Sequence, residues 1–323
     1  MSDLPKMVQI NEEGPREGFQ FEKGPIPTAR KIELIDSLSQ TGLKQIQVAS
    51  FVNPNAVPGM ADAEEIVAGF KRIPGVRYTG LWLNEKGLQR AIASGRVDIV
   101  GSLSLTASET FLKRNQNRTA ADDLAGERRL AKMYKTYHIP VERISIRAAF
   151  GCNFEGEISP SKVTFLISQL AELANEEGFR IRIVSLADTM AWATPKSVKR
   201  LLAAVRELNP DLTIALHLHD TRGMGIANAY AGLEMGVTIF DGSVAGLGGC
   251  PFAAHKGAAG NVCTEDLVFM CDEMGIETGV NLEKLIESAL LAEAVVGHRL
   301  PGSVIHGGSL ARLRAALGAG ACS

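Results

Sequence analysis

The sequence predicts an α/β fold, a (β/α)₈ TIM barrel with additional C-terminal helices, and three observations support this prediction. Short runs rich in apolar and β-branched residues alternate with longer segments of helical periodicity almost from end to end, as in the repeated βαβ units of a parallel sheet. There are eight such runs, the number that closes a barrel. No Gly-x-Gly-x-x-Gly follows the first run, so the alternative of an open doubly wound sheet loses its best support.

The strands and the helices between them can be placed along the chain. Apolar side chains recur at helical spacing over residues 29–42, where Gly42 suits a C-terminal cap. Residues 159–178 repeat this plan, with Ser159 as the N-cap. The eight predicted strands cover residues 7–14, 44–50, 76–83, 97–105, 143–151, 180–188, 212–220 and 237–246.

The length of 323 residues suits a single barrel domain with C-terminal decoration. We expect the barrel over about residues 6–275 and helical decoration over about 276–323, because helical patterns continue after the eighth strand. No Pro- or Ser-rich linker marks a second domain. The prediction is therefore one domain over residues 1–323.

The charge and hydropathy of the chain argue against nucleic acids and membranes as its partners. A formal net charge of -2 lacks the basic excess of a nucleic-acid or anionic-membrane surface. The N-terminal sequence has no apolar core of signal-peptide length, and no stretch approaches the roughly 20 apolar residues of a membrane span. We expect a cytoplasmic protein with a small-molecule substrate, no nucleic acid and no membrane as partners. Barrels of this kind often associate, which leaves a homo-oligomer open.

The five cysteines favour neither a disulfide framework nor a zinc knuckle, because their number is odd and no CxxC spacing occurs. Four of them are best interpreted as small buried or tail thiols. Cys250 differs, because it follows the glycines of residues 242–253 at the top of the eighth strand. Such a loop can carry a thiol over an active site, although an ordinary loop cysteine is the alternative.

Polar residues gather where the predicted strands end. In barrels, the active site is built at the C-terminal ends of the strands and from the loops that follow them. We therefore expect one mouth to collect the polar residues at these ends. They are Arg16 and Glu17 after the first strand, Gln47 and Ser50 at the second, Ser185 and Asp188 at the sixth, and His217, His219 and Asp220 at the seventh.

The pair His217 and His219 predicts a metal site. One residue separates them on a predicted strand, so period-two geometry directs both rings to one face. Glu17 and Asn261 can supply oxygen ligands, and such a set suits Mg²⁺, Mn²⁺ or another octahedral dication. The alternative is a pair of hydrogen-bonded core histidines.

Several motifs together resemble the 3-hydroxy-3-methylglutaryl-CoA lyase family, within the larger group of metal-dependent barrel lyases and Claisen-type synthases. Among the matching runs are NEEGPREGFQFEKG, SLADTMAWATP, HLHDTRGMGIANA and DGSVAGLGGCPFA. Further matches lie in residues 49–66, 159–163 and 258–281, so the resemblance extends to about residue 282. As a group they are far more specific than any one motif.

The resemblance implies metal-dependent retro-Claisen cleavage of a 3-hydroxy-3-methyl dicarboxylic acyl-CoA. The implied substrate is 3-hydroxy-3-methylglutaryl-CoA, a CoA thioester cleaved to acetyl-CoA and acetoacetate with Mg²⁺ or Mn²⁺, in leucine degradation. By the same resemblance, Arg16 stabilises the enolate oxygen and Cys250 exchanges a proton with the acyl-CoA carbon. Asp188 is an acid or base near the substrate hydroxyl.

The resemblance also assigns ligand and binding roles. It gives the metal to Glu17, His217, His219 and Asn261, with His217 also in the catalytic group. It places Gln20, Gln47, Ser50 and Ser185 in the substrate pocket, and Lys23, Lys86 and Lys113 at the CoA phosphates.

Two positions depart from the family pattern. The family has Arg-Asp-Gly where this chain has Arg16, Glu17 and Gly18, and it has a glutamate where this chain has Gln47. The additional methylene of Glu17 moves its carboxylate by roughly 1.5 Å, which is large for a metal site. Gln47 removes a negative charge near the metal. Either change suits a different acyl group, so a citramalyl-CoA lyase is a competing prediction.

Three other functions remain open from the sequence. A Claisen-type synthase uses the same histidine pair, but such enzymes commonly carry further C-terminal regions. Metal-dependent amidohydrolases place a His-x-His motif on the first strand, whereas here it lies on the seventh. A non-catalytic acyl-CoA-binding relative is the non-enzymatic alternative, and its failure to take up a dication would distinguish it.

Overall fold

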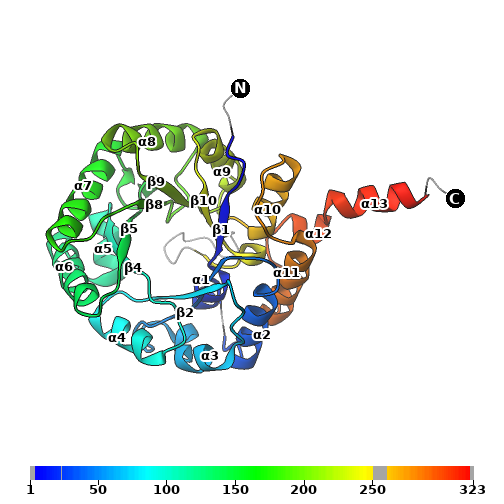
Figure 1. Ribbon diagram of the computed structural model, residues 1–323, viewed down its shortest axis with the longest axis horizontal. Helices are drawn as coiled ribbons and strands as arrows, with labels where there is room; N and C mark the ends of the chain where they lie inside the picture. Colours follow the sequence, from blue (N-terminus) through cyan, green and yellow to red (C-terminus); the bar gives the residue numbers. More distant parts are fainter. Residues whose placement is uncertain (1–3, 23, 250–259, 321–323) are drawn as a thin grey trace.

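The computed structural model describes residues 4–22, 24–249 and 260–320, and eight parallel strands form its centre (Figure 1). Their hydrogen-bonded order is β3-β2-β1-β10-β9-β8-β5-β4. The strands are β1 (Gln9–Glu12), β2 (Gln45–Ser50), β3 (Arg77–Leu81), β4 (Gly101–Thr106), β5 (Val141–Arg147), β8 (Ile183–Ala187), β9 (Thr213–His217) and β10 (Ile239–Gly242). Each overlaps one of the eight predicted runs, although β4 ends one residue beyond its run at Thr106 and β5 begins two residues before its run at Val141. The α/β barrel prediction is confirmed.

Helices surround the strands as a ring, while the last helix extends away from it (Figure 1). The helices are α1 (Gly14–Phe21), α2 (Thr28–Leu38), α3 (Ala63–Gly69), α4 (Glu85–Ser94), α5 (Glu109–Gln116), α6 (Ala120–Thr136), α7 (Pro160–Glu176), α8 (Pro195–Leu208), α9 (Gly225–Glu234), α10 (Thr264–Glu273), α11 (Leu282–Val296), α12 (Val304–Gly307) and α13 (Leu310–Gly320). Two short 3₁₀ turns, at Pro58–Met60 and Val244–Gly246, and a hairpin of β6 (Gly151–Cys152) with β7 (Gly156–Glu157) complete the described elements.

The helix ends follow local side-chain chemistry. Ser159 caps α7 as predicted, because its hydroxyl accepts a hydrogen bond from the Lys162 amide at 3.2 Å. The prediction that Gly42 caps the preceding helix is wrong. Helix α2 ends at Leu38, and Gly42 lies in the following turn with φ 97°, where a Cβ would meet the carbonyl oxygen of Gly279.

Strand register decides which side chains enter the barrel. Leu216 on β9 packs toward the backbone of α9, where a Cβ at Gly232 would contact it. Its neighbour His217 therefore faces inward, because successive side chains of a strand alternate. Ala187 on β8 is the register partner of His217, so the inward face of β8 carries Ala187 and Ser185. The register brings polar side chains from neighbouring strands into one interior.

A seam separates β3 from β4, the two ends of the hydrogen-bonded order. Near the start of β4, the Asp98 amide donates to the Tyr78 carbonyl oxygen at 2.7 Å. Higher up, the Ser104 amide donates to the carboxylate of Glu127 on α6 at 2.9 Å. Side chains of α6 therefore fill the upper part of this seam.

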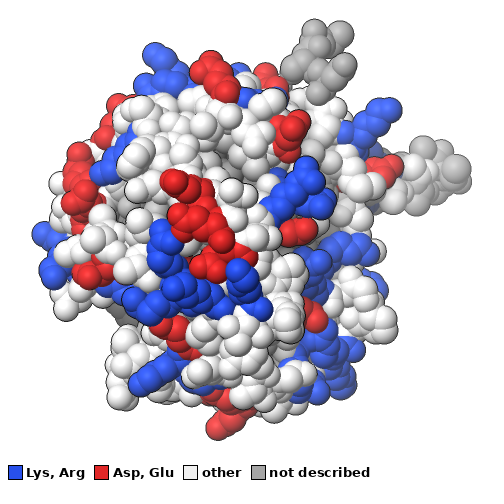
Figure 2. Space-filling model, turned by 60° about the vertical axis from the view of Figure 1, so that its left-hand side comes forward, with Lys and Arg blue, Asp and Glu red and all other residues white. Residues whose placement is uncertain are grey.

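The outer surface is mixed in charge, as Figure 2 shows for the face brought forward there. Ion pairs join neighbouring helices on the outside, such as Arg128 with Glu176 and Lys135 with Glu177. None of the helices in the described part of the chain combines the length and apolar character needed to cross a membrane. No single sign of charge dominates this face.

Candidate active site and metal centre

Three side chains meet at the C-terminal end of the barrel. The Oε1 atom of Glu17 lies 3.4 Å from Nε2 of His219 and 3.7 Å from Nε2 of His217, and the two Nε2 atoms are 3.3 Å apart. All three side chains are largely buried, with 9%, 3% and 15% of their areas exposed for Glu17, His219 and His217. Two imidazole nitrogens and one carboxylate oxygen facing one point make this cluster a candidate divalent-cation site.

The two histidines reach this point by different routes. His217 ends β9, as predicted, but His219 lies beyond the strand and forms an isolated antiparallel bridge with Asn261. The prediction that both histidines belong to one strand is therefore wrong. The reason is that the chain after His217 pairs with residues 260–262 instead of continuing the barrel ladder: the Asp220 amide donates to the Gly260 carbonyl oxygen at 2.7 Å.

Asn261 fits the same cation site. Its side chain is buried, and neither its amide oxygen nor its amide nitrogen has a partner within the described ranges. A Cβ at Gly248 would lie 3.6 Å from Glu17 and 3.7 Å from Asn261, so both side chains line the same hollow. A buried amide oxygen without a donor is costly unless a ligand satisfies it. The donor set therefore suits a hard dication with oxygen and imidazole ligands.

A second set of buried groups orients His217 from behind. The Oδ2 atom of Asp241 lies 3.5 Å from Nδ1 of His217, on the side of the ring away from Glu17. Asn11 donates to Asp241 at 2.9 Å, and Gln9 donates to Asn11 at 2.7 Å. A carboxylate behind a metal-binding histidine fixes its tautomer and ring orientation.

The electrostatics of the cluster follow from these contacts. Burial lowers the pKa of His217, but Glu17 and Asp241 raise it, and the result is about 10. Burial raises the pKa of Glu17, yet Arg16 and His217 hold it well below its usual value. Glu17 is thus a carboxylate at neutral pH, the form that binds a cation.

Arg16 stands beside the cluster because α1 begins directly after β1. Its Nη2 atom lies 2.6 Å from Oε2 of Glu13 and 3.1 Å from Oε2 of Glu17, and its Nε donates to Gln47. These contacts fix a buried guanidinium group at the edge of the cation site. Burial raises the pKa of Glu13 to about 7, against the opposing effect of Arg16.

Asp188 follows β8 and faces the histidines. Its Oδ1 atom accepts hydrogen bonds from the amides of Trp192 at 2.7 Å and Ala193 at 3.0 Å. Its Oδ2 atom is buried without a partner among the described residues. Burial raises the pKa of Asp188 to about 6, while His219 and His217 lower it. A carboxyl group with this pKa can exchange a proton near neutral pH.

The remaining predicted residues divide into three groups. Ser50 ends β2 and Ser185 is the middle residue of β8. Both are buried, and the Ser50 hydroxyl has no partner in the described part of the chain. Gln20 is partly buried on α1, whereas Lys86 and Lys113 are exposed on α4 and α5. Lys23 and Cys250 lie outside the described residues.

Sequence reasoning missed the groups that support the predicted ones. Asp241 and Asn11 belong to predicted strands and alternate with apolar residues. This alternation indicates that both side chains face the interior of the barrel. Glu13 precedes Arg16 by three residues, the spacing of neighbours on a helix, but the helix α1 was not predicted. All three are buried polar residues. Asn11 and Asp241 pair across strands, whereas Glu13 pairs with Arg16 within its own segment.

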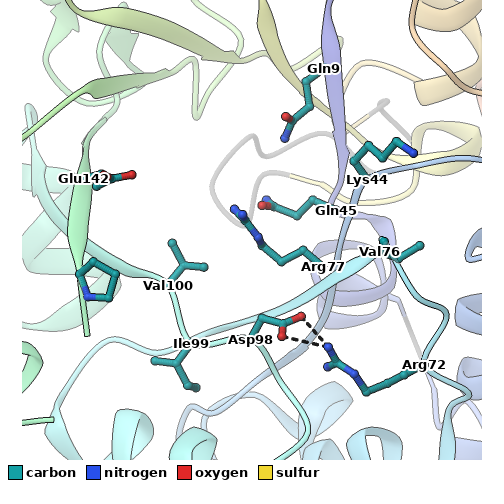
Figure 3. A pocket seen from close by; sticks show the side chains of 12 residues that line it. Gln9, Lys44, Gln45, Arg72, Val76, Arg77, Asp98, Ile99, Val100 and Glu142 are labelled. Carbon is teal, nitrogen blue, oxygen red and sulfur yellow. Dashed lines mark hydrogen bonds and ion pairs between the residues drawn. The ribbon is translucent and has the colours of Figure 1, made fainter. Parts of the chain in front are cut away.

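A separate pocket of about 620 Å³ opens at the opposite end of the barrel, where the strands begin (Figure 3). Lys44, Gln45 and Arg77 line it, and Arg72 is held there by Asp98 at 2.9 Å. None of the residues predicted for the active site lines this pocket. Catalytic groups of barrel enzymes come from the C-terminal ends of the strands, so the cation cluster is the candidate active site.

Comparison with known proteins gives concordant matches. The family model described as HMGL-like matches residues 7–291. The chain is 43% identical over 288 residues to the cytoplasmic 3-hydroxy-3-methylglutaryl-CoA lyase of Homo sapiens. The aligned region covers 89% of this chain and 75% of the human protein. It is 43% identical over 293 residues to the mitochondrial hydroxymethylglutaryl-CoA lyase of Bos taurus, covering 90% of this chain and 87% of the bovine protein.

Solved structures agree with these relatives. An HMG-CoA lyase from Acinetobacter baumannii, in complex with coenzyme A and 3-methylmalate, superposes with a TM-score of 0.85 at 37% identity, over 96% of this chain and 97% of the other. A hydroxymethylglutaryl-CoA lyase from Pseudomonas aeruginosa gives a TM-score of 0.84 at 39% identity, over 93% and 96% of the two chains.

Proposed function

The chain belongs to the HMGL-like family, and from that premise we propose that it cleaves 3-hydroxy-3-methylglutaryl-CoA to acetyl-CoA and acetoacetate. The observation that carries the proposal is the meeting of Glu17, His217 and His219 beside the fixed guanidinium group of Arg16. This set can bind a metal and an oxyanion side by side, as a retro-Claisen cleavage requires.

We propose that Glu17, His217, His219 and Asn261 hold a divalent metal, Mg²⁺ or Mn²⁺. Imidazole, carboxylate and amide ligands suit these ions, and no cysteine of the described residues joins the cluster. When bound, such an ion polarises the 3-hydroxyl group and lowers its pKa. Oε1 of Glu17 comes within 3.4 Å of Nε2 of His219 and 3.7 Å of Nε2 of His217, which supports the glutamate as the source of the carboxylate oxygen at this position.

The residues of the chain divide the chemical work. Asp188 accepts the proton of the 3-hydroxyl, for which its unpartnered Oδ2 atom is available. The oxygen electron pair then forms the new carbonyl bond, the bond between carbons 2 and 3 breaks, and its electrons enter the thioester enolate. Arg16 stabilises the enolate oxygen, and Cys250 delivers a proton to carbon 2. Ser50, Ser185, Gln20 and Gln47 line the acyl pocket, while Lys23, Lys86 and Lys113 bind CoA phosphates.

The complex of the Acinetobacter baumannii relative supports an acyl-CoA whose acyl group resembles a hydroxy dicarboxylic acid, because that structure holds coenzyme A and 3-methylmalate. Citramalyl-CoA belongs to the same chemical class and is the second candidate. The departures Glu17 and Gln47 at the mouth are the observations that keep it in contention. We further propose a cytoplasmic location and one barrel domain over residues 1–323, in which residues of α11 and α12 belong to the apolar core.

Product analysis tests the proposal. The purified protein is incubated with Mn²⁺ or Mg²⁺ and either thioester, and acetyl-CoA is measured against time. We expect release from 3-hydroxy-3-methylglutaryl-CoA, its loss in His217→Gln, and no loss in the matched variant of the exposed His138, His138→Gln. If neither thioester yields acetyl-CoA with either metal, the lyase proposal is wrong.

A further inference from the structure

The strand register places an arginine inside the barrel mouth. Ser145 on β5 pairs with Ser185 on β8, and Ser185 pairs with Ala215 on β9. Register partners in a parallel sheet face the same side of the sheet. Side chains two residues apart on one strand also face the same side, so Arg147 faces the same side as Ser145, and His217 the same side as Ala215. Arg147 therefore faces the interior at the level of His217, two strands away, or roughly 10 Å between backbones.

Two fixed partners hold this guanidinium group in place. Its Nε donates to the Thr106 hydroxyl at 3.0 Å, and its Nη2 lies 3.4 Å from Oδ2 of Asp123 on α6. Arg118 approaches the other carboxylate oxygen of Asp123 at 3.9 Å. Asp123 is only 1% exposed, whereas 21% of the Arg147 side chain is exposed. Two arginines thus share one buried carboxylate at the seam between β3 and β4.

Part of the hydrogen-bonding capacity of the arginines in this cluster is unused. Glu127 lies one turn after Asp123, but its Oε2 atom accepts the Ser104 amide and burial raises its pKa to about 7, against Arg147. A guanidinium group has five N–H donors. The Nη1 atom of Arg147 donates to no group of the described residues, so the exposed part of this side chain can still bind an anion.

We propose that Arg147 is a specificity-determining residue that binds the free carboxylate of a dicarboxylic acyl-CoA, at the end of the acyl group remote from the thioester. This inference rests on the proposed function, because it assumes an acyl-CoA in the mouth. The planar guanidinium group matches a carboxylate with two parallel hydrogen bonds. Thr106 and Asp123 fix its plane in advance, so little side-chain freedom is lost on binding. An uncharged acyl end would leave these donors without an anionic partner.

Binding to the metal-free protein isolates this contact, since a bound metal also attracts carboxylates. Calorimetry compares 3-hydroxy-3-methylglutaryl-CoA with the analogue in which its free carboxylate is an amide. The wild-type protein should bind the acid about 10- to 100-fold more tightly than the amide. Arg147→Gln should bind the two equally, and Arg147→Lys should discriminate less than the wild type. The control Arg128→Gln removes an arginine from the outer ion pair with Glu176 and should behave as the wild type.

The outcomes separate this inference from the lyase proposal. Equal affinities of the wild type for acid and amide overturn the role of Arg147, as does full discrimination by Arg147→Gln. Circular dichroism verifies folding, and if Arg147→Gln is unfolded, Arg147→Lys decides by the same comparison. A wild type that discriminates the two thioesters but cleaves neither with Mn²⁺ refutes the lyase proposal and leaves the Arg147 assignment standing.

Discussion

The imidazole of His217 is held between two carboxylates, with Oδ2 of Asp241 3.5 Å from its Nδ1 and Oε1 of Glu17 3.7 Å from its Nε2. Asp241 is itself fixed by the amide of Asn11 at 2.9 Å. The ring therefore presents Nε2 to the cation site and has little freedom to turn. This arrangement assigns Asp241 a positioning role.

Replacing Asp241 should weaken metal binding without removing a ligand. Asp241→Asn keeps the shape of the side chain but loses the negative charge behind His217. Loss of such an outer carboxylate typically lowers metal affinity about 10- to 100-fold. Titration with Mn²⁺ measures the dissociation constant, with the exposed Asp211→Asn as the control. An unchanged constant in Asp241→Asn would show that ring orientation is set elsewhere.

The length of Glu17 is a second determinant of metal binding. Its Oε1 atom lies 3.4 Å from Nε2 of His219 and 3.7 Å from Nε2 of His217, so the glutamate spans the distance from α1 to the histidines. Glu17→Asp withdraws the carboxylate by roughly 1.5 Å, and we expect the Mn²⁺ dissociation constant to rise about 10-fold or more. Glu207→Asp, on the exposed face of α8, is the matched control. Equal constants for both variants contradict this prediction.

Arg16 should contribute to the rate more than to substrate binding. Its guanidinium group is fixed by Glu13, Glu17 and Gln47 before substrate arrives. A preorganised donor to a developing oxyanion accounts for about 100- to 1,000-fold in kcat. Arg16→Gln should therefore lower kcat by this factor while KM changes little, with Arg30→Gln on the surface as the control. A change confined to KM would instead give Arg16 a role in substrate binding.

The seam between β3 and β4 should make stability depend on pH. Burial raises the pKa of Glu127 from 4.5 to about 7, against the opposing effect of Arg147. Between these values the folded protein retains a proton that the unfolded chain has lost, so stability falls as pH rises from about 4.5 through about 7. Glu127→Gln abolishes this contribution, which is on the order of 3 kcal/mol.

Urea denaturation at pH 5 and pH 8 measures this effect. The stability of Glu127→Gln minus that of the wild type should be larger at pH 8 than at pH 5. For the exposed Glu172→Gln, this difference from the wild type should be the same at both pH values. If the stability difference between Glu127→Gln and the wild type does not vary with pH, the carboxyl of Glu127 titrates at its ordinary value.

The sequence by itself determined the eight strands and the histidine pair, because both depend on local patterns. Alternating burial along a strand is visible in the order of apolar residues, and the ends of parallel strands in a barrel must meet. His217 and Glu17 could therefore be assigned to one mouth before their contacts were known. The motifs around them also carried the resemblance to the HMGL-like family.

Tertiary structure alone decided which groups complete the site. His219 leaves the strand because residues 260–262 compete for its backbone, and Asp241 reaches His217 only because β10 lies beside β9. Arg147 becomes a candidate binding residue through its register with β8 and its contact with α6. Such contacts join residues far apart in the chain, and the local pattern of polar and apolar residues does not specify their partners. The barrel could be predicted from the sequence because the periodicity of its apolar residues is local. The contacts around each proposed metal ligand depend on the packed fold.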